Sequence, residues 1–199
     1  KVKFLIRTLA KLGMNVLMLY TEDTYEVEGQ PYFGAYRGKY TKDEIKELDA
    51  YASMLGVELV PCIQTLAHLH NVLKWPGMDK IRDSADILQP EKEETYQFIE
   101  KLLSSVKENF STNRVHLGMD EAVMLGLGNY LKENGYKKGS LIIREHCNRV
   151  VDICRKLELK PMIWSDMYIT ANSTGGYYDL PENTDCSKWE KPKKDLGLV

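Results

Sequence analysis

The sequence predicts an α/β fold in which parallel strands alternate with helices. Short apolar runs recur along the 199 residues, and segments with helical spacing separate them. Because these runs are apolar throughout, their strands are expected to be buried on both faces, as in a parallel sheet covered by helices. A doubly wound sheet and a (β/α) barrel both have this order of elements. No GxGxxG motif or P-loop follows a strand, which disfavours nucleotide binding.

The elements are recognised by their spacing and by the residues at their ends. Gly13 and Gly56 end the first two helices, and Thr41 and Glu44 have the spacing of a capping box at the start of the second. Pro90 suits the first turn of the third helix. In chain order the predicted elements are a helix over residues 3–12, a strand over 14–20, a helix over 41–55, a strand over 57–63, a helix over 90–110, a strand over 115–119, a helix that continues to 131, a helix over 142–157, a strand over 161–164 and the start of a strand at 196–199.

The composition excludes several classes of function. Hydrophobic residues make up 43% of the chain and charged residues 28%, which is typical of one globular domain, here expected to span residues 1–199. A net charge of −2 gives no reason to expect a nucleic-acid partner, and no apolar run approaches the roughly 18 residues of a membrane span. The first residues lack the pattern of a signal peptide, so we expect a cytoplasmic protein. The four cysteines form no CxxC pair and predict no disulfide framework.

Polar residues follow the carboxyl ends of the four complete strands. Binding and catalytic residues gather at this end of the strands in both candidate architectures. We therefore expect the polar side chains to share one pocket. The residues are Glu22 and Asp23, Gln64 and His68, Asp120 and Glu121, and Trp164 and Asp166.

Asp120 and Glu121 are the strongest catalytic candidates, because they directly follow a buried strand. Burial and a neighbouring negative charge both raise the pKa of a carboxyl group. Such a pair can keep one acid protonated while the other is ionised, which general acid catalysis requires. The alternative is a solvated helix N-terminus, where acidic residues favour the helix dipole.

Motifs around these residues resemble glycoside hydrolase family 20, the β-N-acetylhexosaminidases. Residues 116–121 (HLGMDE) are similar to the H-x-G-x-D-E signature of that family. Further segments resemble one branch of the family and occur in the same order along the chain. They are residues 20–25 (YTEDTY), 37–40 (RGKY), 64–69 (QTLAHL) and 164–167 (WSDM).

The resemblance implies a (β/α)₈ barrel and a retaining exo-hydrolase without a cofactor. Its substrate would be an oligosaccharide or glycoconjugate that ends in β-linked N-acetylglucosamine or N-acetylgalactosamine. The family uses substrate assistance, in which the 2-acetamido oxygen of the sugar attacks its own anomeric carbon. By motif, Glu121 would act first as the acid and then as the base, and Asp120 would orient the acetamido nitrogen. His68, with Glu22 or Asp23, would set the protonation of Glu121.

Three further residues take supporting roles in this interpretation. Trp164 would line the acetamido pocket, because an indole face suits a methyl group and sugar C–H bonds. Arg37 would contact a sugar hydroxyl or anchor a loop. Asp166 would hold a hydroxyl or cap the following helix. The resemblance also implies that the chain covers barrel strands two to five and the start of strand six, with the first strand before Lys1 and later strands after Val199.

Simpler interpretations fit some of these features. Glu22 and Asp23 also suit a capped turn, and Trp164 also suits the core. The missing barrel strands motivate a second function, a non-catalytic sugar-binding or structural module. His68 and His70 form an H-x-H pair that, with Asp120, motivates a third, a metal-assisted barrel hydrolase. The ligand count is low for such a site, so we expect no metal. Oligomerisation is compatible with every one of these functions.

Overall fold

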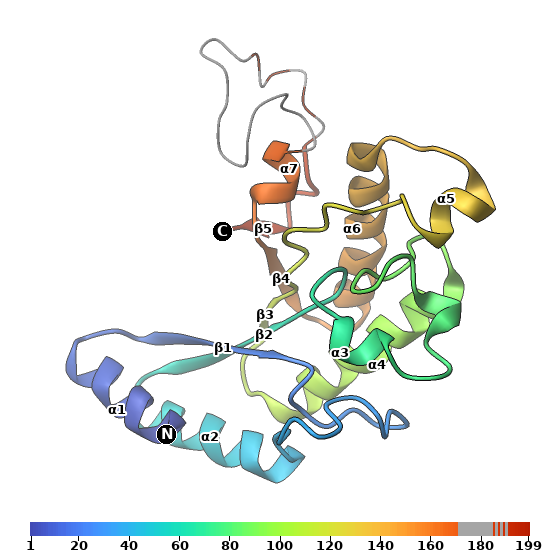
Figure 1. Ribbon diagram of the computed structural model, residues 1–199. Coiled ribbons are helices and arrows are strands. Elements are labelled where there is room, and N and C mark those ends of the chain that lie inside the picture. Colours follow the sequence, from blue (N-terminus) through green and yellow to red (C-terminus); the bar gives the residue numbers. More distant parts are fainter. Residues whose placement is uncertain (171–184, 186, 188, 190) are drawn as a thin grey trace.

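The computed structural model describes residues 1–170, 185, 187, 189 and 191–199 (Figure 1). Its elements are α1 (Val2–Lys11), β1 (Val16–Glu22), α2 (Lys42–Met54), β2 (Glu58–Ile63), α3 (His70–Leu73), a 3₁₀ turn (Asp79–Ile81), α4 (Glu93–Asn109), β3 (Arg114–His116), α5 (Asn129–Asn134), α6 (Gly139–Lys156), β4 (Lys160–Ile163), α7 (Asp166–Thr170) and β5 (Gly197–Leu198). None of the described helices combines the length and the apolar character needed to cross a membrane.

The strands form one parallel sheet in which spatial order equals chain order, β1-β2-β3-β4-β5. A doubly wound sheet reverses its order at a switch point, whereas a barrel adds each strand beside the last. The main helices also follow one another around the outside, since α1 packs on α2, α2 on α4 and α4 on α6. The fold is therefore an arc of a (β/α) barrel. The predicted four strands and the fifth fragment are confirmed.

The core lies between the sheet and the outer helices. In β2 every residue after Glu58 is buried, as expected for a strand covered on both faces. Cys62, Cys147 and Cys154 are free and buried, and burial raises the pKa of each thiol to about 12. They pack as small hydrophobic residues, as predicted for the latter two. The fourth cysteine, Cys186, lies outside the described residues.

Local signals place several elements correctly. Thr41 and Glu44 form the predicted capping box at the start of α2, with Glu44 N donating to Thr41 Oγ1 at 3.1 Å and Thr41 N donating to Glu44 Oε2 at 2.8 Å. Some boundaries differ by a few residues. The helix predicted from Pro90 begins at Glu93, and the first strand is shifted by two residues to Val16–Glu22.

The helix predicted to continue to residue 131 is wrong. Residues 120–122 are irregular, residues 123–128 form turns and bends, and α5 covers only Asn129–Asn134. The buried carboxylate of Asp83 accepts backbone N–H groups from Gly126, Gly128 and Tyr130 at 2.7, 3.2 and 2.8 Å. Asp83 thus satisfies amides that would otherwise need helical partners, and it holds the segment in an irregular path. The sequence around 120 does not reveal this distant partner.

Candidate active site

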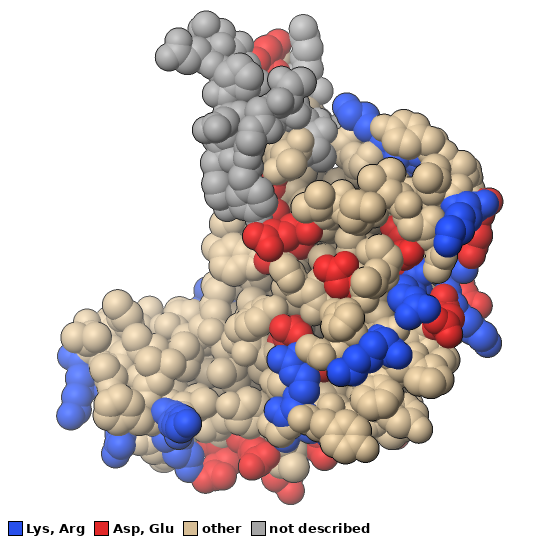
Figure 2. Space-filling view, in the orientation of Figure 1, with Lys and Arg blue, Asp and Glu red and all other residues tan. Residues whose placement is uncertain are grey.

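The polar residues predicted at the strand ends meet at the carboxyl edge of the sheet. Figure 2 shows acidic side chains gathered in the middle of the face that Figure 1 presents. The strand before them is shorter than predicted, because β3 ends at His116 and the chain turns at Gly118 and Met119, both with φ of +71°. This turn brings Asp120 and Glu121 beside the loop that follows β2.

Each carboxylate oxygen of Asp120 has one polar neighbour. His68 Nε2 lies 3.2 Å from Oδ2, and Gln64 Nε2 donates to Oδ1 at 2.9 Å. The Gln64 amide is fixed in turn, because its Oε1 accepts the N–H of Met119 at 3.2 Å. The Asp120 side chain is 22% exposed, so its carboxylate faces the pocket in one orientation.

Glu121 reaches further into solvent than its neighbour. Its Oε2 lies 3.7 Å from His68 Nε2, and its side chain is 55% exposed. The sequence argument assumed burial of both acids, and the described residues do not bury this one. Its backbone is fixed, since its N–H donates to Asp166 Oδ2 at 3.0 Å and its φ is +53°. Asp166 is buried at the first position of α7, so its observed contact is to the chain that carries Glu121.

Glu22 and Asp23 form a separate group with Arg37. The guanidinium Nη1 lies 2.6 Å from Glu22 Oε1 and 2.6 Å from Asp23 Oδ1. Burial raises the pKa of Asp23, and the positive charge of Arg37 opposes that rise. Both acids therefore pair directly with Arg37, which anchors its loop to the end of β1.

Tyr20 connects the two groups. Its hydroxyl donates to Glu22 Oε2 at 3.3 Å and accepts from Gln64 Nε2 at 3.5 Å. Burial raises its pKa to about 12, so the phenol keeps its proton at neutral pH. A continuous line of polar contacts thus runs from the Arg37 group to Asp120.

Trp164, which follows β4, packs against His116 of β3. The ring centroids are 4.5 Å apart with an angle of 53° between the planes. Trp164 is 37% exposed, so it is a wall residue with one accessible part, and not a core residue. His116 is fully buried behind it, and burial lowers the pKa of the imidazole to about 4. Its Nδ1 accepts the N–H of Gly118 at 3.1 Å.

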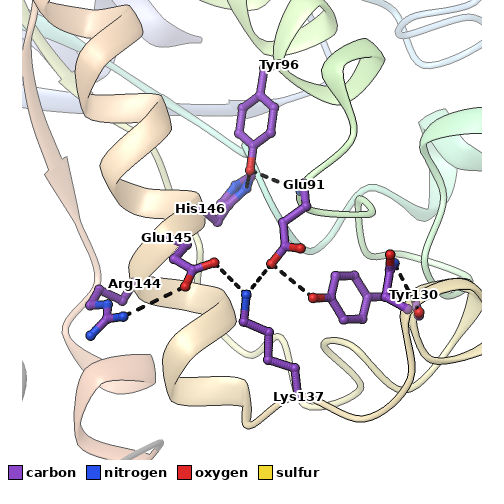
Figure 3. A network of polar contacts seen from close by, with 8 residues as sticks. Glu91, Tyr96, Tyr130, Lys137, Arg144, Glu145 and His146 are labelled. Atoms are coloured by element: carbon purple, nitrogen blue, oxygen red, sulfur yellow. Dashed lines mark hydrogen bonds and ion pairs between the residues drawn. The ribbon is translucent and has the colours of Figure 1, made fainter.

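A second histidine supports the pocket from behind. In Figure 3, His146 of α6 lies beside the hydroxyl of Tyr96. His146 Nδ1 is 3.3 Å from that hydroxyl and Nε2 is 3.0 Å from Thr65 O. Because the carbonyl can only accept, Nε2 carries the proton and Nδ1 accepts from Tyr96. The Tyr96 oxygen accepts the N–H of Glu91 at 3.2 Å. Thr65 precedes the His68 turn, so this chain holds the loop that positions Gln64.

The outer end of this support is an ion cluster on the surface. Lys137 Nζ lies 2.6 Å from both Glu91 Oε1 and Glu145 Oε2, and Tyr130 donates to Glu91 Oε1 at 2.9 Å (Figure 3). These contacts tie the loops before α4 and α6 together.

The residues predicted at the strand ends lie in this region, and their roles stay predictions. No role was predicted from the sequence for Tyr20, Gln64 or His146. Gln64 was recognised only as a polar residue at a strand end. A polar residue at the end of an apolar strand, as Gln64 is, or on the apolar face of a helix, as His146 is, is expected to be buried. Buried polar groups need hydrogen-bond partners, so both positions could have been recognised as members of a polar network. Among the residues that the structure describes, no group of three or more His, Cys, Asp or Glu side chains could hold a metal ion.

The sequence model of glycosyl hydrolase family 20, catalytic domain, matches residues 2–198. The chain belongs to glycosyl hydrolase family 20. It is 29% identical to hexosaminidase D of Bos taurus over 166 residues, which cover 78% of this chain and 48% of the bovine protein. It is 28% identical to hexosaminidase D of Homo sapiens over 182 residues, which cover 86% of this chain and 35% of the human protein. The chain thus spans about half or less of the length of these relatives.

Solved structures of family 20 proteins share the fold. A GH20 exo β-N-acetylglucosaminidase from Vibrio harveyi, in complex with N-acetylglucosamine, matches 99% of this chain with a TM-score of 0.73 and 19% identity, over 35% of its own length. A β-N-acetylhexosaminidase from Bacteroides fragilis matches 100% of this chain with a TM-score of 0.72 and 20% identity, over 42% of its own length. These likenesses agree with the incomplete (β/α) barrel seen in the sheet order.

Proposed function

We propose that the protein is a retaining exo-β-N-acetylhexosaminidase that cleaves terminal β-linked N-acetylglucosamine or N-acetylgalactosamine by substrate assistance. The observation that carries the proposal is the joint contact of His68 with Asp120 and Glu121, at 3.2 and 3.7 Å, at the carboxyl edge of a family 20 sheet. A carboxylate oriented by Gln64 and His68 beside a second, accessible acid supplies both parts that this reaction needs.

In the first step the carboxylic acid of Glu121 gives its proton to the glycosidic oxygen. The acetamido oxygen of the sugar forms a bond to the anomeric carbon as the bond to the leaving oxygen breaks, and an oxazolinium ion results. The acetamido nitrogen becomes positive in this step. Asp120, oriented by Gln64 and His68, accepts its N–H and stabilises the developing charge.

In the second step the Glu121 carboxylate removes a proton from water, and the water oxygen attacks the anomeric carbon. The oxazolinium ring opens and the product keeps the β configuration, because two displacements have occurred. The exposure of Glu121 suits this role, since both the leaving group and the water must reach it. Trp164, exposed beside His116, is assigned to the wall of the acetamido pocket.

The proposal treats residues 1–199 as part of one catalytic domain, in keeping with the single hydrophobic core. The partner is a glycan that ends in N-acetylhexosamine, which agrees with the sugar named in the Vibrio harveyi complex. The cytoplasmic location, the capacity to oligomerise and the lack of a nucleic-acid partner stay predictions from the sequence.

Hydrolysis of a chromogenic N-acetylglucosaminide and N-acetylgalactosaminide tests the proposal. We expect Glu121→Gln to lower kcat by about 10²- to 10⁴-fold, the usual contribution of a general acid. Glu158→Gln is a matched control, because it alters a glutamate whose side chain is 86% exposed just before β4, at the edge of the sheet opposite to Glu121. Retention of most activity by Glu121→Gln would remove that residue from its assigned role.

A series of substrates with fluorinated acetamido groups tests the part of Asp120. Fluorine lowers the nucleophilicity of the acetamido oxygen, so kcat/KM should fall steeply with each added fluorine in the unaltered protein. Asp120→Asn should lower the rate on the parent substrate. A rate independent of fluorine content would show that the acetamido group takes no part in the displacement.

A further inference from the structure

Three aromatic side chains form a cluster on loops that follow β1 and β2. Tyr32 stacks on Trp75 with ring centroids 5.1 Å apart and 26° between the planes, and the Tyr36 ring lies 6.1 Å from Trp75 at 37°. Tyr32 is 51% exposed and Tyr36 is 96% exposed. Tyr36 also has a φ of +63°, a conformation that costs a non-glycine residue about 1 kcal/mol or more. None of these rings has a role in the hydrolytic mechanism.

The loop that carries the two tyrosines is anchored firmly. Phe33 is buried between them and packs edge-on against Tyr25 and Phe98 at 5.0 and 6.2 Å. Lys39 Nζ donates to Phe33 O at 3.1 Å, which ties the far end of the loop to its middle. The backbone that carries the exposed rings is thus fixed before any ligand arrives, which reduces the entropy lost on binding.

The cluster adjoins the candidate active site. Tyr36 is followed in sequence by Arg37, whose guanidinium lies 2.6 Å from Asp23 at the end of β1. On the other side, the Lys74 amine beside Trp75 acts on the pKa of the same Asp23. A chain that leaves the pocket along the ends of β1 and β2 therefore meets these rings.

The chemistry of the cluster fits a neutral sugar. Aromatic faces suit the C–H surfaces of pyranose rings. The nearest cations are already engaged by groups of the protein. Lys74, whose amine lies 5.5 Å from the centre of the Trp75 ring, donates to Asn71, Arg37 is paired with two carboxylates, and Lys39 donates to a backbone carbonyl. Each aromatic side chain can bury at most about 150–250 Å², so the three together bury less than the roughly 800 Å² per partner of a stable protein interface. The rings therefore match a short oligosaccharide better than an anionic ligand or a protein partner.

We propose that Tyr32, Tyr36 and Trp75 form a subsite for the sugar units on the leaving-group side of the cleaved bond. The subsite takes neutral oligosaccharides, so the protein acts on chains longer than a disaccharide in preference to short glycosides. This inference rests on the proposed hydrolase function and adds a preference for substrate length to it.

The test compares three substrates that end in the same N-acetylhexosamine: the methyl glycoside, the disaccharide and the tetrasaccharide. The methyl group is too small to reach the rings, so the methyl glycoside reports on the active site alone. In the unaltered protein kcat/KM should rise from the methyl glycoside to the tetrasaccharide. Tyr36→Ala should lower kcat/KM for the tetrasaccharide about 3- to 10-fold, as expected for one aromatic contact, and leave the methyl glycoside within about twofold.

Matched variants separate this effect from a general loss of structure. Tyr36 is almost fully exposed, so its removal does not disturb the core, and Tyr36→Phe should keep the preference for length because it keeps the ring. Tyr136→Ala removes a tyrosine that is 75% exposed on a different loop and should change neither rate. Trp75→Phe should lower the tetrasaccharide rate less than Trp75→Ala does.

Direct binding distinguishes failure of this inference from failure of the proposed function. Tryptophan fluorescence of Glu121→Gln should change on titration with the tetrasaccharide, and adding Trp75→Phe should remove the part of that change that does not come from Trp164 in the candidate active site. If no substrate is hydrolysed but the titration succeeds, the hydrolase assignment fails and the subsite stands. Equal rates for all three substrates, or an equal loss on all three in Tyr36→Ala, would overturn the subsite. A change in sedimentation of Tyr36→Ala without a change in length preference would instead identify the rings as a contact between proteins.

Discussion

Gly118 offers the sharpest test of how the pocket is built, because a single methyl group there should disturb Asp120 at a distance. A Cβ at this position would lie 2.1 Å from Gln64 Oε1 and 2.8 Å from the backbone oxygen of Ile63. The first contact requires the Gln64 side chain to leave, and the second involves a strand carbonyl that cannot move without shifting β2. Gly118→Ala should therefore detach Gln64 from Asp120.

The loss of stability can be worked from these contacts. The φ of +71° costs alanine about 1 kcal/mol. Displacing Gln64 breaks its hydrogen bonds with Met119 N and Asp120 Oδ1, each worth about 1 kcal/mol. We expect Gly118→Ala to lower the free energy of unfolding by about 3 kcal/mol in total, with further strain from the Ile63 contact added to this.

Gly56 provides a matched control, because its φ is +69° and a Cβ there would meet nothing within 4 Å. Gly56→Ala should cost only the backbone part, about 1 kcal/mol. Urea denaturation followed by circular dichroism measures both variants, with the difference read from the midpoints at a common m-value. Hydrolysis by Gly118→Ala should also fall through kcat, since Asp120 loses one donor. Equal losses of stability in the two glycine variants would refute the argument from close approach.

Three other predictions concern the groups around the pocket. Burial lowers the pKa of His146 from 6.5 to about 4, so the unfolded chain takes up this proton at a higher pH than the folded chain does. The free energy of unfolding should therefore fall by up to about 3 kcal/mol as the pH drops from 6.5 towards 4. The variant His146→Gln should make Tm depend less on pH in this range. Arg37→Met leaves the buried Asp23 carboxylate without its cation and should lower the free energy of unfolding by about 3 kcal/mol at neutral pH. The loss should be smaller at acidic pH, where Asp23 is protonated, and smaller in the double variant with Asp23→Asn. An unchanged Tm would contradict the pairing. Asp83→Ala removes the acceptor for three backbone amides and should lower the free energy of unfolding by about 3 kcal/mol. Hydrogen exchange should become faster at residues 126–130 but not in α4. Unchanged exchange at residues 126–130 would refute the role of Asp83.

The layout of the sheet could be predicted because each strand carries its own signal. The apolar run of β2 and the glycines after α1 and α2 are local features, and local features decide where an element begins and ends. The parallel order then follows from the alternation with helices. The choice between an open sheet and a barrel arc could not be made from these features, since both have the same elements and differ only in which strands become neighbours.

The contacts within the site were harder to predict, because they join residues that are distant in sequence. Gln64 reaches Asp120 across 56 positions, and Asp83 reaches Tyr130 across 47. Nothing near residue 120 indicates that the following segment will find a carboxylate from an earlier loop, so the local preference for a helix gave the wrong structure there. His68 was expected to act on Glu121 together with Glu22 or Asp23, whereas its direct contacts, with Asp120 and Glu121, are set by the turn at residues 118 and 119.

Backbone conformation explains how the strand ends present these side chains. Among the described residues, seven other than glycine have a positive φ. Four of them lie at or shortly after strand ends: Glu22 is the last residue of β1, His68 lies in the loop after β2, and Met119 and Glu121 lie in the loop after β3. Each costs about 1 kcal/mol relative to an ordinary conformation, and such strain persists only where surrounding contacts outweigh it. Here the contacts are those of the site itself. Arg37 pairs with Glu22, Asp120 contacts His68, and Asp166 accepts the backbone N–H of Glu121. The same bonds that orient the acids therefore also hold the backbone that carries them, so loss of one partner should release both at once.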